Sequence, residues 1–228
     1  MTNYYQEILS LKGQEVEYEP SGYGHIKMVK HHFPFSIKEK EFDYLRDLII
    51  RYNLKSGYEL GTGMGVSTAA IGLGFKFTGG KLVTIDSYIE EHLESYGAYE
   101  YIPPKLVYEN DGYKSAQFLI NHFKLENTVF PEIGWSPDNI LGLLDKHLNS
   151  KIDFVFYDGG HFDHQLVKDI EIIAPKLADN FVIAFHDFHP DFFTKRVMSA
   201  IERVFKSPLK IAVPRPDGED LSVIIKNK

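Results

Sequence analysis

The sequence predicts an α/β fold in which one mostly parallel sheet is covered by helices on both faces. From residue 57 onward, short apolar segments alternate with longer segments of helical periodicity, which is typical of βα units. Segments 154–157 (FVFY) and 181–185 (FVIAF) are apolar throughout, as expected for parallel strands buried on both faces. The last two apolar segments, 208–213 and 221–226, are joined by a stretch too short for a crossover helix. They should therefore pair as an antiparallel hairpin.

The alternation of apolar and helical segments predicts seven strands. They are expected near residues 57–61, 81–86, 128–133, 152–158, 180–186, 208–213 and 221–226. The helices between them are expected near residues 66–74, 111–124, 137–148, 163–177 and 191–205. A further helix is expected near 37–53, because Ser36 and Glu39 have the spacing of a capping box. Its apolar residues recur at helical spacing, as on a helix that covers a sheet: Phe42, Leu45, Leu48 and Ile49.

The composition indicates one globular domain that does not bind nucleic acid. The 228 residues are 43% apolar, which is enough for one sizeable core. Residues 1–35 are assigned to an N-terminal extension and 36–228 to the domain. The net charge of -7 disfavours contact with phosphate backbones. Cysteine is absent, which excludes disulfides, thiolate zinc sites and thiol nucleophiles. Without a secretory signal or a long apolar span, a cytoplasmic location and no membrane contact are expected.

The first predicted strand runs into a glycine turn and then a helix. Glycines at positions 61, 63 and 65 allow a sharp turn and close approach of a ligand, and the amides that open the helix can face polar groups. Glu59, at the strand end, would repel a pyrophosphate, so a ligand with hydroxyls or an amine is favoured. Asp86 ends the next strand. A dinucleotide-binding fingerprint also has an acid roughly 20 residues on, so Asp86 alone does not decide between ligands.

Glu59-x-Gly61-x-Gly63, followed by Asp86, resembles class I S-adenosylmethionine (SAM) dependent methyltransferases. Thr68 stands where the dinucleotide fingerprint has its helix-packing glycine, which favours this resemblance. The resemblance implies a three-layer αβα, Rossmann-like fold over residues 36–226 and SAM as the cofactor. The cofactor-binding residues that it implies, with Trp135 and Ser136 beside the adenine, are Glu59, Gly61, Thr62, Gly63, Ser67, Asp86, Ser87, Trp135, Ser136 and Asp158. Trp135 has an equal alternative in packing, and Ser136 should also cap the next helix.

A second group of polar residues follows the fourth and fifth strands. Asp158, His186 and Asp187 should converge there, because the carboxyl ends of parallel strands meet at one crevice. They could hold Mg²⁺ or another divalent metal, which would lower the pKa of a substrate hydroxyl. Asp158-Gly-Gly-His161 resembles the metal-dependent O-methyltransferases of macrocin and catechol type, which implies metal ligands at Asp158 and Asp187 and a catalytic base at His161. His186 stands where that family has an acid. The alternative is that both acids cap helices and His186 is a wall residue.

These observations predict O-methylation of a small hydroxylated metabolite, a sugar or a phenol, with His161 and Asp158 as catalytic residues and His189 as a reserve base. The tyrosine-rich segment 87–111 is either a substrate lid or a packed surface loop. The expected partner is a small-molecule methyl acceptor. Whether the protein forms a homo-oligomer is left open by the sequence. Two alternatives remain. One is a SAM-fold or nucleotide-binding protein without methyl transfer, similar to cephalosporin hydroxylases or NAD-dependent relatives; the other is a binding module with a vestigial site.

Overall fold

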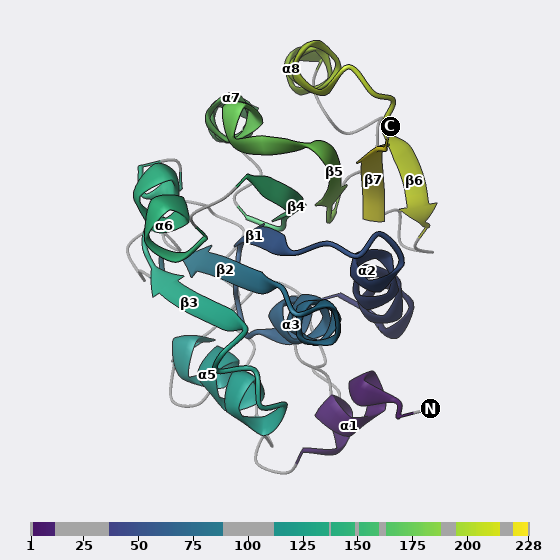
Figure 1. Cartoon of the computed structure of the whole chain (residues 1–228), viewed down its shortest axis with the longest axis vertical. Coiled ribbons are helices and arrows are strands. Elements are labelled where there is room, and N and C mark those ends of the chain that lie inside the picture. Colours follow the sequence, from purple (N-terminus) through teal and green to yellow (C-terminus); the bar gives the residue numbers. More distant parts are fainter. Residues whose placement is uncertain are drawn as a thin grey trace, which may run out of the picture.

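The computed structural model contains a seven-stranded sheet between two layers of helices (Figure 1). It describes residues 2–11, 37–88, 112–136, 138–148, 151–159, 163–187, 195–214 and 221–227. The strands are β1 (Ser56–Leu60), β2 (Lys81–Asp86), β3 (Val129–Ile133), β4 (Ile152–Tyr157), β5 (Leu177–Phe185), β6 (Lys210–Val213) and β7 (Leu221–Lys226). Their order is β3-β2-β1-β4-β5-β7-β6. Strands β1 to β5 are parallel, and β7 is antiparallel to β5 and to β6, which confirms the predicted fold class and the hairpin.

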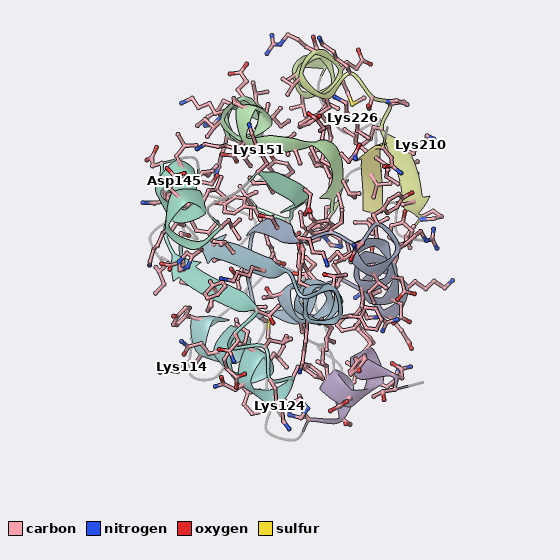
Figure 2. The ribbon with its side chains drawn as sticks, in the orientation of Figure 1. Lys114, Lys124, Asp145, Lys151, Lys210 and Lys226 are labelled. Carbon is pink, nitrogen blue, oxygen red and sulfur yellow. The ribbon has the colours of Figure 1, made fainter. Side chains whose placement is uncertain are left out.

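The helices cover both faces of the sheet. They are α1 (Tyr4–Ser10), α2 (Glu39–Arg51), α3 (Val66–Thr78), α5 (Gly112–His122), α6 (Ile140–His147), α7 (Asp163–Ile173) and α8 (Lys195–Phe205), with a 3-10 turn at Ala174–Lys176. One buried cluster joins α1, α2, α3 and α5 to the sheet, and a second joins α6, α7 and α8 to its other face. Figure 1 shows these two helical layers on opposite sides of the strands. In Figure 2 the labelled lysines lie at separate places over the fold.

Helix α2 begins at Glu39, two residues later than the start near residue 37 that the sequence predicts. The N-cap residue is Lys38, and its backbone N–H donates to Glu41 Oε2 at 2.7 Å, which is the glutamate half of a capping box. A lysine side chain has no acceptor for the other half. The prediction that Ser36 and Glu39 form the capping box is therefore wrong, and Ser36 lies outside the described residues. Glu39 instead accepts hydrogen bonds from Asn3 and Gln6, at 2.7 and 3.0 Å, which tie α1 to α2. The predicted apolar face of α2 is confirmed, because its four residues are all buried.

Helix α7 ends earlier than predicted. It stops at Ile173, and a 3-10 turn that contains Pro175 follows, because proline has no N–H to continue the helix. Strand β5 accordingly begins at Leu177 instead of 180. Among the described residues, no helix combines the length and the apolarity that a membrane span requires.

The sheet brings three chain segments together at one edge. The strand order runs one way from β1 and the other way from β4, and crevices in open parallel sheets form at such a reversal. Leu60 pairs with Tyr157, and Tyr157 pairs with Phe185. The residues that follow these three strands, at positions 61, 158 and 186, therefore lie side by side.

Candidate functional site

The glycine turn after β1 packs directly on the end of β4. Gly61 has φ +93°, and a Cβ added to it would lie 2.0 Å from the carbonyl oxygen of Asp158. Gly65 has φ +88° and approaches the backbone of Ala116 on α5, where an added Cβ would lie 2.6 Å from its Cα. The N–H groups of Gly61 and Thr62 both donate to the carbonyl of Ile85, at 2.9 and 3.3 Å. The turn is thus fixed on three sides, and Gly61 and Gly65 are required by close packing as well as by φ.

Glu59 lies beneath this turn and is fully buried. Its Oε1 accepts a hydrogen bond from Ser67 Oγ and its Oε2 accepts one from Thr68 Oγ1, both at 2.7 Å. Burial raises the pKa of Glu59 to about 7, although these hydroxyls lower it. The structure therefore makes Glu59 a link between β1 and the start of α3. Direct contact of Glu59 or Ser67 with a ligand stays a prediction.

Asp86 faces the turn from the end of β2. Its Oδ2 accepts from the N–H of Gly63 at 2.9 Å, and its Oδ1 accepts from the N–H of Tyr88 at 3.1 Å. Burial raises the pKa of this carboxyl. Ser87 follows it directly. Tyr88, the first tyrosine of the segment 87–111, has φ +48° and donates its hydroxyl to the carbonyl of Gly63 at 3.2 Å. A positive φ is unfavourable for a bulky residue, so hydrogen bonds to Asp86 and Gly63 hold Tyr88 in place.

The turn after β3 lies beside Asp86, because the N–H of Gly134 donates to the carbonyl of Asp86 at 2.9 Å. The N–H of Trp135 donates to Asn139 Oδ1 at 2.8 Å. Ser136 Oγ donates to Asp169 Oδ1 on α7 at 2.5 Å. Asn139, not Ser136, is the N-cap of α6, so the prediction that Ser136 caps this helix is wrong. The Ser136 hydroxyl instead donates its hydrogen bond to Asp169 of α7.

The predicted cluster after β4 and β5 is brought together by the structure. His186 Nδ1 lies 3.0 Å from Asp158 Oδ1 and 3.3 Å from Asp187 Oδ1. On the other side of the ring, Nε2 lies 3.6 Å from Glu41 Oε2 of α2. Both His186 and Glu41 are buried. Burial alone would lower the pKa of His186, but Asp158, Asp187 and Glu41 raise it to about 12. In this arrangement the imidazolium itself balances the charge of the acids around it.

The cluster also fits a divalent metal ion. The ligand atoms of Asp158, His186 and Asp187 all lie within 4.8 Å of one another. The 3.0 and 3.3 Å separations from Nδ1 to the two carboxylates are close to the roughly 3 Å expected between adjacent ligands of an octahedral ion with bonds near 2.1 Å. Glu41 faces the other ring nitrogen, as an outer carboxylate does beside a metal-bound histidine. A metal held by these three residues would need neutral His186, so it would have to displace the proton that the acids keep on the ring. His161 and His189 lie outside the described residues, as does segment 89–111.

A family model described as a methyltransferase domain matches residues 58–188, which is more than half of the chain. The chain belongs to this methyltransferase family. The match spans the glycine turn, Asp86 and the cluster after β4 and β5, and the fold is that of class I SAM-dependent methyltransferases. No curated protein sequence matches the chain.

Solved structures agree with the methyltransferase fold at low sequence identity. An O-methyltransferase from Bacillus cereus in complex with SAH is 16% identical, with a TM-score of 0.60 over 85% of this chain and 84% of the other. The O-methyltransferase TomG from Streptomyces achromogenes, in complex with SAM, is 14% identical, with a TM-score of 0.58 over 85% and 82%. A precorrin-6y C5,15-methyltransferase from Geobacter metallireducens is 13% identical, with a TM-score of 0.57 over 86% and 91%. These likenesses show the fold, and they do not fix the atom that is methylated.

Two buried acids beside the site carry a signal that was present in the sequence. Glu41 lies on the buried face of α2 with Phe42 and Leu45, and Asp169 lies on the buried face of α7 with Leu166 and Ile170. A carboxylate at helical spacing within an apolar stripe is costly unless it has a specific partner. A carboxylate at such a position therefore indicates a polar contact on the buried face of the helix, although the sequence alone does not identify the residue that it contacts.

Proposed function

We propose that this protein transfers the methyl group of SAM to a hydroxyl oxygen of a small metabolite, a sugar or a phenol. The observation that carries the proposal is the contact between the glycine turn and the polar cluster. An added Cβ at Gly61 would lie only 2.0 Å from the carbonyl oxygen of Asp158, so a donor on the turn would lie beside Asp158, His186 and Asp187. Membership of the methyltransferase family supports the donor, and the cluster supports an oxygen acceptor.

The donor half of the proposed site is formed by the ends of β1, β2 and β3. The methionine part of SAM would lie on Gly61, Thr62 and Gly63, and its ribose hydroxyls on Asp86. A carboxylate offers about four acceptor positions, and the backbone N–H groups of Gly63, Tyr88 and Ser87 all act on Asp86. Acceptor capacity for a ribose hydroxyl therefore remains on the same side chain.

The adenine and the remaining donor contacts follow from the same placement. Trp135 and Ser136 would flank the adenine, because their turn is hydrogen-bonded to Asp86 through Gly134. Ser87 would lie near the ribose. Glu59 supports these contacts from beneath, where it ties the turn to α3 through Ser67.

The acceptor half would be formed by Asp158 and Asp187, with the predicted base His161, which lies outside the described residues. Methyl transfer to oxygen is an in-line displacement at an activated carbon, so the protein has to align the hydroxyl, exclude water and remove one proton. Asp158 would hold the hydroxyl beside the donor, and His161 would accept its proton. A divalent metal on Asp158, His186 and Asp187 would supply Lewis-acid activation of that hydroxyl. Glu41 keeps the His186 ring oriented from α2.

The test combines binding with turnover. Thermal unfolding of the full chain is measured with SAM, SAH and NAD, since a ligand at 100 times its Kd stabilises the folded state by about 2.7 kcal/mol. SAM and SAH should raise the transition temperature and NAD should not. Methyl transfer is then assayed against catechols and hydroxylated sugars, with Mg²⁺ or Mn²⁺ and after chelation. Protection by NAD alone would reject the proposal in favour of a nucleotide-binding relative. If chelation leaves turnover unchanged, the metal has no part in the proposed reaction.

A further inference from the structure

The turn after β3 is held from behind by two side chains of α7. Gln165 and Asp169 lie four residues apart, so they project from the same face of this helix. Gln165 Nε2 donates to the carbonyl of Ser136 at 3.0 Å, and Asp169 Oδ1 accepts from Ser136 Oγ at 2.5 Å. The carbonyl and the hydroxyl of Ser136 are therefore both fixed by α7. Ser136 Oγ uses its single proton in this contact, so it has no proton to donate to a ligand.

Asp169 is buried, so its hydrogen bond with Ser136 has to offset the cost of burying a carboxyl group. Its side chain is 4% exposed on a helix face that otherwise packs into the core, where an apolar residue would be less costly. Burial raises the pKa of Asp169 to about 7, and the hydrogen bond from Ser136 lowers it. Burial raises the pKa of the Tyr58 and Tyr157 phenols, and the nearby charge of Asp169 raises it further. Neither phenol oxygen hydrogen-bonds within the described part of the chain, so Ser136 is the contact that Asp169 makes.

The same turn is fixed from its other side. Asn139 Oδ1 accepts from the N–H of Trp135 at 2.8 Å, and the N–H of Asn139 donates to the carbonyl of Trp135 at 3.0 Å. The N–H of Gly134 donates to the carbonyl of Asp86 at 2.9 Å, which places the turn beside the acid assigned to the ribose. We infer that Asp169 is a positioning residue which, through Ser136, sets the turn that faces the adenine of bound SAM without contacting SAM itself. The inference rests on the proposed function, because it assumes that SAM binds at this edge.

The experiment measures SAH binding to the full chain by calorimetry and by the emission of Trp135, which is the sole tryptophan. Asp169→Ala should weaken SAH binding by about tenfold, because a hydrogen bond to a charged group is lost at the turn. It should also alter the change in emission that SAH causes. Asp169→Asn keeps an oxygen that can accept from Ser136, so it should restore binding to within about threefold of the wild type. Tyr157→Phe is the matched control, since it removes a buried hydroxyl near Asp169 that has no hydrogen-bond partner among the described residues. The affinity of this variant should stay within about twofold of the wild type.

A double-mutant cycle decides whether Asp169 acts through Ser136. Ser136→Ala should weaken SAH binding as much as Asp169→Ala, and the double variant should bind no more weakly than either, within about twofold. If Asp169→Ala does not fold, Ser136→Ala alone carries the decision. Wild-type affinity and emission in both single variants would overturn the inference while the proposed function stands. Independent, additive losses would overturn it too. A wild-type chain that binds neither SAH nor SAM would overturn both proposals at once.

Discussion

Replacing Gly61 by alanine tests whether the turn and the end of β4 form one rigid unit. The new Cβ would lie 2.0 Å from the carbonyl oxygen of Asp158 and 2.5 Å from its carbonyl carbon. Both are backbone atoms at the end of a central strand, so no rotamer change can relieve the contact. The residue would also carry φ +93°, which costs a residue with a Cβ about 1–2 kcal/mol. With the backbone shift added, the free energy of unfolding should fall by about 3–5 kcal/mol.

Gly63→Ala is the matched control for this substitution. Gly63 also has a positive φ, +50°, but an added Cβ would meet no atom within 4 Å. It should therefore lose only the conformational term, about 1 kcal/mol. Urea unfolding of the wild type and both variants gives the two differences. The reasoning fails if Gly61→Ala and Gly63→Ala destabilise the protein equally, because close packing against Asp158 would then contribute nothing.

Three further predictions concern acids around the site. The pKa of Glu59 is raised to about 7, so its contribution to stability is present below its unfolded pKa and is lost as pH rises through 7. Glu59→Gln should therefore reduce the fall in unfolding free energy between pH 5 and 8 by up to about 3 kcal/mol, and the fall that remains is the part due to Asp169. A pH dependence equal to that of the wild type would contradict this prediction. Glu41→Gln should weaken Mn²⁺ binding by about tenfold, measured by calorimetry, because an outer carboxylate orients the histidine ligand; unchanged affinity would exclude that role. Asp86→Asn should weaken SAH binding by about tenfold, since the amide has one oxygen fewer with which to accept a ribose hydroxyl beside the backbone N–H groups that already act on this side chain. Wild-type affinity would place the ribose elsewhere.

Most of the fold could be predicted because its signals are local. The apolar runs of β4 and β5 reveal buried parallel strands, and the short connection before β7 allows only a hairpin. The convergence of Asp158, His186 and Asp187 also followed from the sequence alone, since the ends of neighbouring parallel strands must meet. Neither inference needed knowledge of a long-range side-chain contact.

The capping box of α2 shows where a local signal was not enough. Ser36 with Glu39 and Lys38 with Glu41 have the same spacing, and serine is the better N-cap by intrinsic preference. The choice depends on what each glutamate meets in the folded protein. Glu39 meets Asn3 and Gln6 of α1, while Glu41 turns inward toward His186. Tertiary packing therefore selects the later start, and no pattern within the helix contains that information.

The same limit explains why the sequence did not indicate the contacts that three buried acids make between segments around the site. Glu59 links β1 to α3, Asp169 links α7 to the turn after β3, and Glu41 lies between α2 and the end of β5. Each acid is buried and reaches a different segment at the same edge of the sheet. A buried carboxyl is costly unless its partner is held at the right distance, so each of them penalises movement of the segment that it contacts. Rigid placement of donor and acceptor is what an in-line methyl transfer requires, so substitutions of Asp169 and Glu41 should disturb the site although neither acid is assigned a contact with a ligand. Glu59 keeps its predicted contact with the cofactor in addition to this supporting role.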